Sequence, residues 1–590
     1  MRSSYPHVVV YDRAETWLPS NLQGSPKQIR AWDVSKPIGY IPQVPHTFAL
    51  FEGGAGYAIL NEHGVSVSES TCPARFASLP RSQGGEALFD ISAMSRVALE
   101  RVKTAREAIR IMGDLAFKYG FYGAMWDDDE QKKDEAGEAL MVADRKEAWV
   151  FHVTPDDTGK SAVWVAQRVP DTDITVVANS FIIRFVESGN DSFMHSENMY
   201  DVALRNGLWT QGTKLDFAKV YGKARVPSHS SYSNMRVWRL FTLANPDILG
   251  SLDPHPNDWM DGYPFSVTPK HSLTRDDIFR MYRDHFEGTQ FDMTQNEAGG
   301  PFGDPDRYDT EAHGNMSLAR ALQGEFGRPV SMFRTSYTTI TRSKASLPPE
   351  VGSMMYYSQQ QPSASVFVPM YVSMSEVPRI YKRGSLFKHD KESMFWTVTA
   401  VSNWVHKFYK FAREDLRLLQ RSIEEYDVDV VDRKAASLIN DGQLQRATYL
   451  MDSFTHNISK VSHERYSEFF WYIMAKFHDG YIMHDPEAAT VVMKSLFYPE
   501  WWLKDVGYFS ARETGGSFGA TFEPDLKYRR LEQIYEPELP WSLMTFFVGI
   551  VIGSFVSMCF AVLGVSAMKT TRRIGYRAIP WTRSQCLMRN

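Results

Sequence analysis

Hydrophobic and polar residues begin to alternate just after an Asn-Glu-His-Gly stretch at residues 61–64. Asn and Gly adopt the backbone angles of tight turns more readily than other residues. Val65 and Val67 then alternate with Ser66 and Ser68. This pattern predicts a turn followed by a β-strand with one buried face.

Further runs rich in β-branched and aromatic residues follow at short spacing, separated by turns that contain Asp, Gly or Pro. They comprise residues 139–143, 148–153, 162–169 and 174–179. Short strands that are closed by such turns predict an antiparallel meander.

Residues 84–120, which precede the meander, have a helical period. The apolar positions that fall near one helical face are Ala98, Leu99, Ala105, Ile109 and Met112. We expect two consecutive amphipathic helices, the first capped by Ser92 or Ser95 and the second ended by Gly113 or Gly120. Helices followed by a run of strands predict an α+β fold, with helices laid on antiparallel sheets.

The last third of the chain has a different pattern. The pattern of residues 405–531 predicts a mostly helical, packed extension with charge pairs on its exposed face. We expect residues 532–540, which contain Pro and Glu, to form a short linker. Residues 541–568 contain no charged residue. A bilayer needs about 20 apolar residues, so we expect a transmembrane helix rather than a buried core helix, which rarely runs so long without a polar face.

The charge distribution predicts the topology of that helix. Residues 569–590 carry six basic and no acidic residues, so by the positive-inside rule we expect a cytosolic tail. The body would then lie in a lysosome-like or secretory lumen or outside the cell. A tail-anchored protein with a cytosolic body is the alternative, but it would have to move six positive charges across the membrane. Three glycosylation sequons, at Asn190, Asn315 and Asn457, agree with a lumenal body.

Composition narrows the class of protein. Of the 590 residues 43% are hydrophobic and 13% aromatic, which suffices for a packed core. The net charge is −5, so without the basic tail the chain carries −11, and no basic stripe marks the body. We therefore expect no nucleic-acid partner. The sequence indicates neither an oligomeric state nor a cofactor.

Two clusters of reactive side chains have both a chemical and a structural interpretation. Cys72, with His63 as a base, would be a nucleophile at a strand end, but most free cysteines are small buried residues, and Pro73 follows directly. His285 stands near two acidic residues, yet the spacing matches no zinc motif. We favour the structural interpretation for both and expect no metal.

A set of short motifs is spread in order from about residue 37 to about residue 410. They occupy residues 39–47, 61–64, 69–72, 137–140, 147–150, 161–170, 177–181, 237–239, 263–267, 283–289, 303–308, 333–337 and 383–387. Together they resemble the C69 family of dipeptidases, which are N-terminal-nucleophile hydrolases related to penicillin V acylases and bile salt hydrolases. The resemblance implies an αββα sandwich of two antiparallel sheets between helices, over residues 1–404.

The resemblance also implies a mechanism. An N-terminal-nucleophile hydrolase uses the side chain of its first residue as nucleophile and its own α-amino group as base, which is partly neutral at pH 7 because its pKa lies near 8. The family's nucleophile is a cysteine at the mature N-terminus, so Cys72 does not match it. We expect that this sequence begins downstream of the true start of the protein, and that a leader holds both a signal peptide and the nucleophile.

Three residues are candidates for the site. Asn179, at the end of a predicted strand, has the oxyanion-hole role in the resembling family, although such an asparagine also starts turns. Thr71 occupies the position at which the resembling family has a second oxyanion contributor, or it is an ordinary strand threonine. Arg334 orients the nucleophile, binds a substrate carboxylate or forms a structural ion pair.

These features predict a membrane-anchored, cysteine-type dipeptidase that hydrolyses short peptides. Two alternatives stay open. One is a non-catalytic relative that acts as a binding or scaffold protein, and the other is an amidase of the same superfamily that acts on non-peptide amides.

Overall fold

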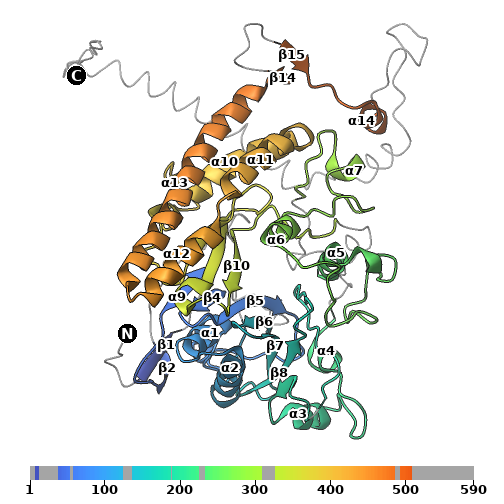
Figure 1. Ribbon diagram of the computed structural model, residues 1–590. Helices are drawn as coiled ribbons and strands as arrows, with labels where there is room; N and C mark the ends of the chain where they lie inside the picture. Colours follow the sequence, from blue (N-terminus) through green and yellow to red (C-terminus); the bar gives the residue numbers. More distant parts are fainter. Residues whose placement is uncertain are drawn as a thin grey trace, which may run out of the picture. The chain divides into compact units, whose positions relative to one another are not determined.

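The computed structural model describes residues 7–11, 37–53, 57–123, 136–187, 189–224, 233–307, 326–484 and 492–507. Its largest sheet has seven antiparallel strands in the order of the chain (Figure 1). The strands are β3 (Leu50–Gly53), β4 (Ala58–Asn61), β5 (Ser66–Cys72), β6 (Gly137–Ala143), β7 (Ala148–Pro155), β8 (Ala162–Val169) and β9 (Phe193–His195). The meander is confirmed, with the strands predicted at 139–143, 148–153 and 162–169 in place.

The predicted turn at residues 61–64 joins β4 to β5. Gly64 has a φ of 83°, and its N–H donates to the carbonyl of Asn61 at 2.9 Å. The side-chain oxygen of Asn61 accepts the backbone N–H groups of His63 and Val65 at 3.1 and 2.9 Å. Its amide nitrogen donates to the carbonyl of Leu99 at 3.0 Å. Asn61 therefore both shapes the turn and ties it to the helix layer.

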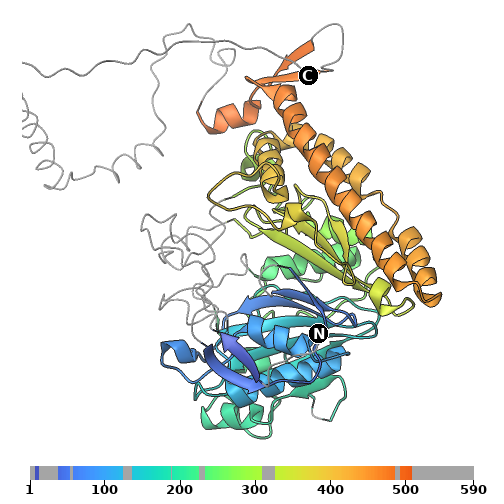
Figure 2. The same ribbon diagram turned by 90° about the vertical axis from the view of Figure 1, so that its left-hand side faces the viewer.

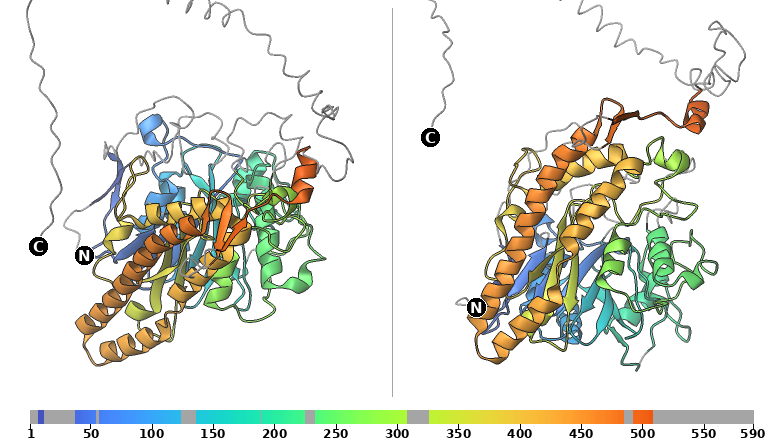
Figure 3. Two further views of the ribbon diagram at one scale, coloured as in Figure 1. Left: turned by 90° about the horizontal axis from the view of Figure 1, so that it is seen from above. Right: turned by 45° about the horizontal axis from the view of Figure 1, so that its top comes forward.

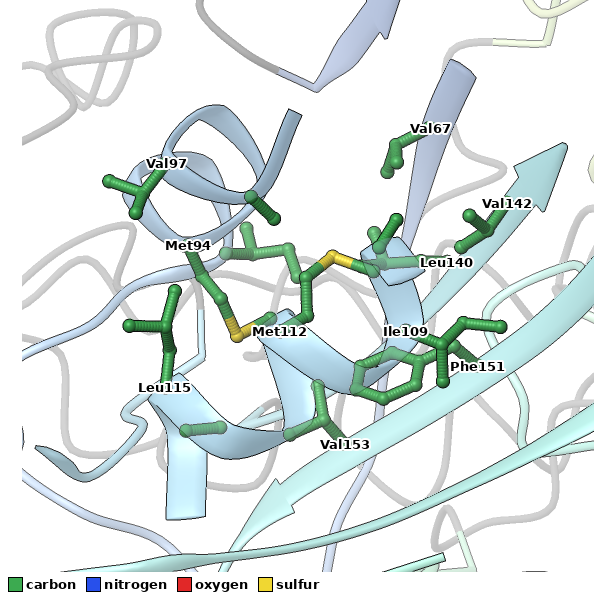
Figure 4. Packing of buried hydrophobic residues seen from close by; sticks show 14 of the residues in the cluster. Val67, Met94, Val97, Ile109, Met112, Leu115, Leu140, Val142, Phe151 and Val153 are labelled. Carbon is green, nitrogen blue, oxygen red and sulfur yellow. The ribbon is translucent and has the colours of Figure 1, made fainter. Parts of the chain in front are cut away.

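Two helices, α1 (Ile91–Leu99) and α2 (Ala105–Tyr119), cover one face of this sheet, as the helical period predicts. Figure 4 shows Met94 and Met112 from these helices packed toward Leu140 and Phe151 of the sheet. All four side chains are fully buried. This apolar cluster fixes the helices against β5, β6 and β7.

The ends of these helices differ in part from the prediction. Asp90, not a serine, caps α1, because its carboxylate accepts the N–H of Ala93 at 2.6 Å, whereas Ser92 and Ser95 lie buried inside the helix. Gly120 ends α2, as predicted. Gly113 lies within α2 instead, and a Cβ there would come within 2.3 Å of the Trp164 ring.

The prediction of a fourth strand at residues 174–179 is wrong. Only Ile174 makes a bridge there, with Val267, through a pair of 2.9 Å hydrogen bonds. The strand that pairs with β8 is instead β9. Because Asn179 has a φ of 57°, the chain turns at this residue and does not extend a sheet.

A second antiparallel sheet comprises β10 (Tyr337–Ser343), β11 (Ser353–Gln359) and β12 (Val368–Tyr371). It packs on the other face of the first sheet, where Phe51 and Leu60 share a core with Met355 and Met370. The hydroxyl of Ser343 also donates to the carbonyl of Gly64 at 2.8 Å. The two sheets are therefore directly stacked.

Four helices cover the second sheet: α10 (Met394–Lys407), α11 (Tyr409–Glu424), α12 (Val428–Asn440) and α13 (Leu444–Lys476). Figure 2 and Figure 3 show the long α13 lying along this layer. The order of layers is helix, sheet, sheet, helix. The α+β class predicted from the sequence is confirmed.

The other described elements are short. They are β1 (His7–Tyr11), β2 (Pro37–Pro42), α3 (Met199–Arg205), α4 (Phe217–Tyr221), α5 (Asn234–Ala244), α6 (Arg275–Tyr282), α7 (Asn296–Gly299), α9 (Pro349–Gly352), β13 (Phe477–His478), β14 (Tyr481–His484), β15 (Val492–Ser495) and α14 (Glu500–Asp505). Among them, α4 and α5 lie beside the candidate site.

The structure corrects the prediction of a single-pass membrane protein with a lumenal or extracellular body. Within the described ranges, no helix combines the length and the apolar character that a membrane crossing requires. The longest, α13, has 33 residues but carries charged side chains such as Lys460 and Glu464. The linker at 532–540, the predicted span at 541–568 and the basic tail at 569–590 lie outside the described residues.

Candidate functional site

Asn179 lies in the loop that follows β8 and is anchored to the end of β5. Its backbone N–H donates to Oγ of Ser70 at 2.9 Å, and its side-chain Nδ2 donates to the carbonyl of Thr71 at 2.8 Å. The positive φ of 57° is one that asparagine tolerates better than most residues. The structure therefore brings together two of the three residues singled out in the sequence.

The side-chain amide of Asn179 is held from its other end by Arg236 of α5. Nη2 of this arginine donates to Oδ1 of Asn179 at 2.7 Å. An amide nitrogen carries two hydrogens. One of them goes to Thr71, and the other has no acceptor within the described part of the chain. The amide thus presents one oriented N–H donor.

Arg236 was not a candidate from the sequence, although the motif at residues 237–239 begins at the next residue. Its role depends on a contact between residues 57 positions apart, which no local pattern reveals. The sequence feature that comes nearest to indicating Arg236 is this neighbouring motif, which lies on an amphipathic helix.

Thr71 contributes its backbone to the site. The hydroxyl of its half-buried side chain donates to Oε1 of Glu69 at 2.6 Å, while its carbonyl accepts from Asn179. Thr71 and Glu69 lie on the same face of β5, because side chains two positions apart in a strand do so.

Arg334 lies on the segment that precedes β10, and its side chain is exposed. The hydrogen bonds of Asn179 involve Ser70, Thr71, Ser233 and Arg236. A role of Arg334 in the site stays a prediction.

Cys72 is a buried residue, as we expected. Its side chain is 0% exposed, and Sγ donates to the carbonyl of Ser70 at 3.2 Å. It is the only cysteine that the structure describes. His63 lies before β5 and Cys72 at its end, so the pair does not form a nucleophile and base.

His152 of β7 supports the segment that follows Asn179. Its Nε2 accepts the backbone N–H groups of Ile182 and Ile183 at 3.0 and 3.3 Å, so the ring is neutral and acts as an acceptor. Complete burial lowers the pKa of His152 to about 3, because the charged form would be desolvated. This histidine is thus a structural support for the loop.

A small hollow adjoins the anchored asparagine. Its lining comprises Pro73, Ser180, Phe181, Ala218, Gly222, Lys223, Ser233, Asp258 and Trp259, and its volume is ≈ 20 Å³. Ser180 directly follows Asn179, and Oγ of Ser233 donates to the carbonyl of Asn179 at 3.5 Å. The hollow therefore adjoins the backbone of Asn179.

A second polar cluster surrounds His285 and His406. His285 is fully buried beside Glu287, with Nδ1 and Oε1 3.3 Å apart. Burial disfavours its charged form, but the hydrogen bond and charge of Glu287 outweigh this, so the pKa of His285 is raised. The arrangement is that of a buried ion pair.

Asp304, Asp306 and His406 bring possible ligand atoms within 4.8 Å of one another, which the sequence did not suggest. Nδ1 of His406 lies 2.7 Å from Oδ2 of Asp306. That distance is one of a direct hydrogen bond. His406 and Asp306 are therefore joined directly in this buried cluster.

Comparison with known proteins identifies the family of this chain. The model of peptidase family C69 matches residues 55–422. The chain therefore belongs to peptidase family C69.

Similar proteins include a probable dipeptidase of Salmonella dublin, 25% identical over 333 residues, and a probable dipeptidase of Latilactobacillus sakei, 23% identical over 335 residues. These alignments cover 56% of this chain and 66% and 60% of the two relatives. A probable dipeptidase B of Lactococcus lactis is 22% identical over 311 residues, which is 52% of this chain and 56% of that protein. The chain thus spans somewhat less than two thirds of the length of these relatives.

Proposed function

We propose that the protein is a dipeptidase that hydrolyses short peptides by a cysteine-type N-terminal-nucleophile mechanism. Family membership and three relatives named as probable dipeptidases support this activity. The stacked sheets between helix layers are consistent with the αββα sandwich of such hydrolases. No cofactor takes part in the proposed reaction.

The observation that carries the proposal is the oriented amide of Asn179. Attack of a thiolate on the scissile carbonyl produces a tetrahedral intermediate with a negative oxygen. The side-chain N–H of Asn179 that does not bind the carbonyl of Thr71 would donate to this oxygen. Oxyanion donors of this kind are each worth about 10²- to 10³-fold in kcat.

Arg236 and Thr71 have positioning roles in this mechanism. Their hydrogen bonds to opposite ends of the Asn179 amide fix its rotation before substrate binds. A donor that is already oriented costs no reorganisation in the transition state. From its place beside Asn179, Thr71 also remains our candidate for a second contributor to the oxyanion site. Arg334 remains our candidate for a residue that orients the nucleophile or binds a substrate carboxylate.

The test is a dipeptide assay on the mature protein purified from its native source, combined with alkylation by iodoacetamide. We expect hydrolysis of at least some dipeptides, its loss on alkylation, and mass-spectrometric detection of the modified thiol on the first residue of the mature chain. Failure to hydrolyse any member of a broad dipeptide panel would contradict the activity. Hydrolysis that survives full alkylation of the terminal residue would contradict the mechanism.

A further inference from the structure

Ser70, which precedes Thr71 on β5, carries a hydroxyl group beside the anchored asparagine. Its Oγ accepts the backbone N–H of Asn179 at 2.9 Å. A serine hydroxyl has one hydrogen to donate in addition to the lone pairs with which it accepts. This hydrogen has no acceptor within the part of the chain that the structure describes. The half-buried Ser70 therefore offers an O–H donor next to the amide of Asn179.

The neighbouring hydroxyl of Thr71 is already engaged. It donates to Oε1 of Glu69 at 2.6 Å. Successive side chains of a strand point to opposite faces of the sheet, so the hydroxyls of Ser70 and Thr71 lie on opposite sides of β5. A group that is bound on the side where Ser70 meets Asn179 therefore faces the hydroxyl of Ser70. Thr71 acts on this side through its carbonyl, which holds the amide.

The hydroxyl of Ser70 has a rigid support. Ser70 pairs with Ala139 of β6, and the N–H of the preceding Glu69 donates to the carbonyl of Tyr57 at 3.0 Å. On the other side of the contact, the side chain of Asn179 is bound at both of its ends. Sites that are built on strands hold their geometry more precisely than sites on loops. The strand therefore fixes the hydroxyl relative to the amide.

The proposed reaction has a use for such a donor. The negative oxygen of a tetrahedral intermediate accepts more than one hydrogen bond, and serine hydroxyls are among the side chains that form oxyanion holes. The amide of Asn179 supplies a single N–H. A hydroxyl beside it adds a second donor without adding a charge.

We propose that the hydroxyl of Ser70 is a second oxyanion donor, which hydrogen-bonds the same substrate oxygen as the amide of Asn179. The N–H that Oγ accepts polarises the hydroxyl, so that it donates more strongly. Ser70 is then a catalytic residue, whereas Arg236 acts through Asn179. The inference rests on the proposed dipeptidase function and adds to it a residue that contacts the reacting oxygen.

The first test is steady-state kinetics of Ser70 variants with a dipeptide that the unchanged protein hydrolyses. We expect Ser70→Ala to lower kcat about 10²-fold with little change in KM, since an oxyanion donor acts in the transition state. Ser70→Thr, which keeps a hydroxyl, should restore most of the loss. Thr71→Val keeps the carbonyl that holds Asn179 and should change kcat little. Ser68→Ala, on the same face of β5, is the matched control and should leave kcat unaltered.

A second test separates direct donation from support of the asparagine. Ser70→Ala is combined with Asn179→Gly, which keeps the backbone N–H but has no side-chain amide. A serine that only holds the amide in place has nothing left to orient in this background, so kcat should fall no further. A direct donor should cause a further loss of about 10-fold.

An unaltered kcat in Ser70→Ala would overturn the inference, as would a loss that disappears in the Asn179→Gly background. Either result would leave the proposed dipeptidase function in place. Absence of dipeptide hydrolysis by the unchanged protein would instead refute the proposed function, and the inference with it.

Discussion

Nη2 of Arg236 donates to Oδ1 of Asn179 at 2.7 Å, while Nδ2 of the same amide donates to the carbonyl of Thr71 at 2.8 Å. A carboxamide that is held at only one end can rotate, and its oxygen and nitrogen can exchange places. Because both ends are bound, the amide has one orientation. The arginine therefore determines the direction of the remaining N–H.

Replacement of Arg236 by methionine should lower kcat for a dipeptide by about 10- to 100-fold, because a misplaced donor loses much of its effect. KM should change much less. The measurement is steady-state kinetics with a dipeptide that the unchanged protein hydrolyses. Arg205→Met, which removes an arginine from an ion pair on α3, is the control and should leave kcat unaltered. An unaltered kcat in Arg236→Met would exclude the positioning role.

Replacement of Asn179 by glycine removes the donor while it preserves the positive φ of 57°. We expect a loss of about 10²- to 10³-fold in kcat with an intact fold. Asn296 also has a positive φ, of 49°, so Asn296→Gly tests the backbone effect alone and should keep full activity. A glycine variant at Asn179 with normal kcat would refute the oxyanion assignment.

Replacement of Cys72 by alanine should leave kcat unchanged, because its buried thiol contacts the Ser70 carbonyl and not the hollow. The loss of packing should cost about 1 kcal/mol of unfolding free energy. Urea denaturation and the dipeptide assay measure the two effects. Loss of activity in a stably folded variant would make Cys72 a functional residue after all.

The buried, neutral state of His152 should make the unfolding free energy of the protein depend on pH. Its pKa is about 3 in the folded protein, against 6.5 for an ordinary histidine, so only the unfolded chain takes up a proton as the pH falls below 6.5. This contribution is fully present above pH 6.5 and is lost progressively toward pH 3. Between pH 6.5 and 5 it amounts to about 2 kcal/mol.

The variant His152→Gln, whose side-chain oxygen can accept a backbone N–H, should lack this part of the pH dependence. The comparison is made by urea denaturation at pH 7, 6 and 5. His271→Gln, at an exposed site, serves as control and should behave like the unchanged protein. Parallel pH profiles for His152→Gln and the unchanged protein would contradict the neutral, buried state of His152.

Arg283 and Glu424 form a poorly exposed ion pair, with side chains 19% and 8% exposed and a shortest distance of 2.6 Å. Arg283→Met or Glu424→Gln alone should cost about 3 kcal/mol, because each leaves a charge without its partner. The double variant should lose less than the sum of the two.

The control for this cycle is Arg421 with Glu414, an ion pair that is more than 60% exposed at both side chains. Its single variants should change the unfolding free energy by less than about 0.5 kcal/mol. Strictly additive losses at Arg283 and Glu424 would show that the two residues stabilise the fold independently.

The sequence predicted the elements whose signals are local. The turn at Asn61 to Gly64, three strands of the meander and the two helices that cover it all lie where period and turn residues place them. The predicted strand at 174–179 failed because its β-branched residues are followed by a left-handed Asn179, which a hydrogen bond to Ser70 stabilises. A contact with a residue 109 positions away overrode local propensity there.

The sequence by itself therefore determined the α+β class, the meander and, through resemblance, Asn179 and Thr71 as neighbours in one site. Only the tertiary structure decided that Arg236 hydrogen-bonds the amide of Asn179 and that Ser70 holds its backbone. The physical reason is the distance along the chain over which each effect acts. Alternation and turn chemistry act over a few residues, whereas a site is assembled by packing that brings distant segments within hydrogen-bond distance.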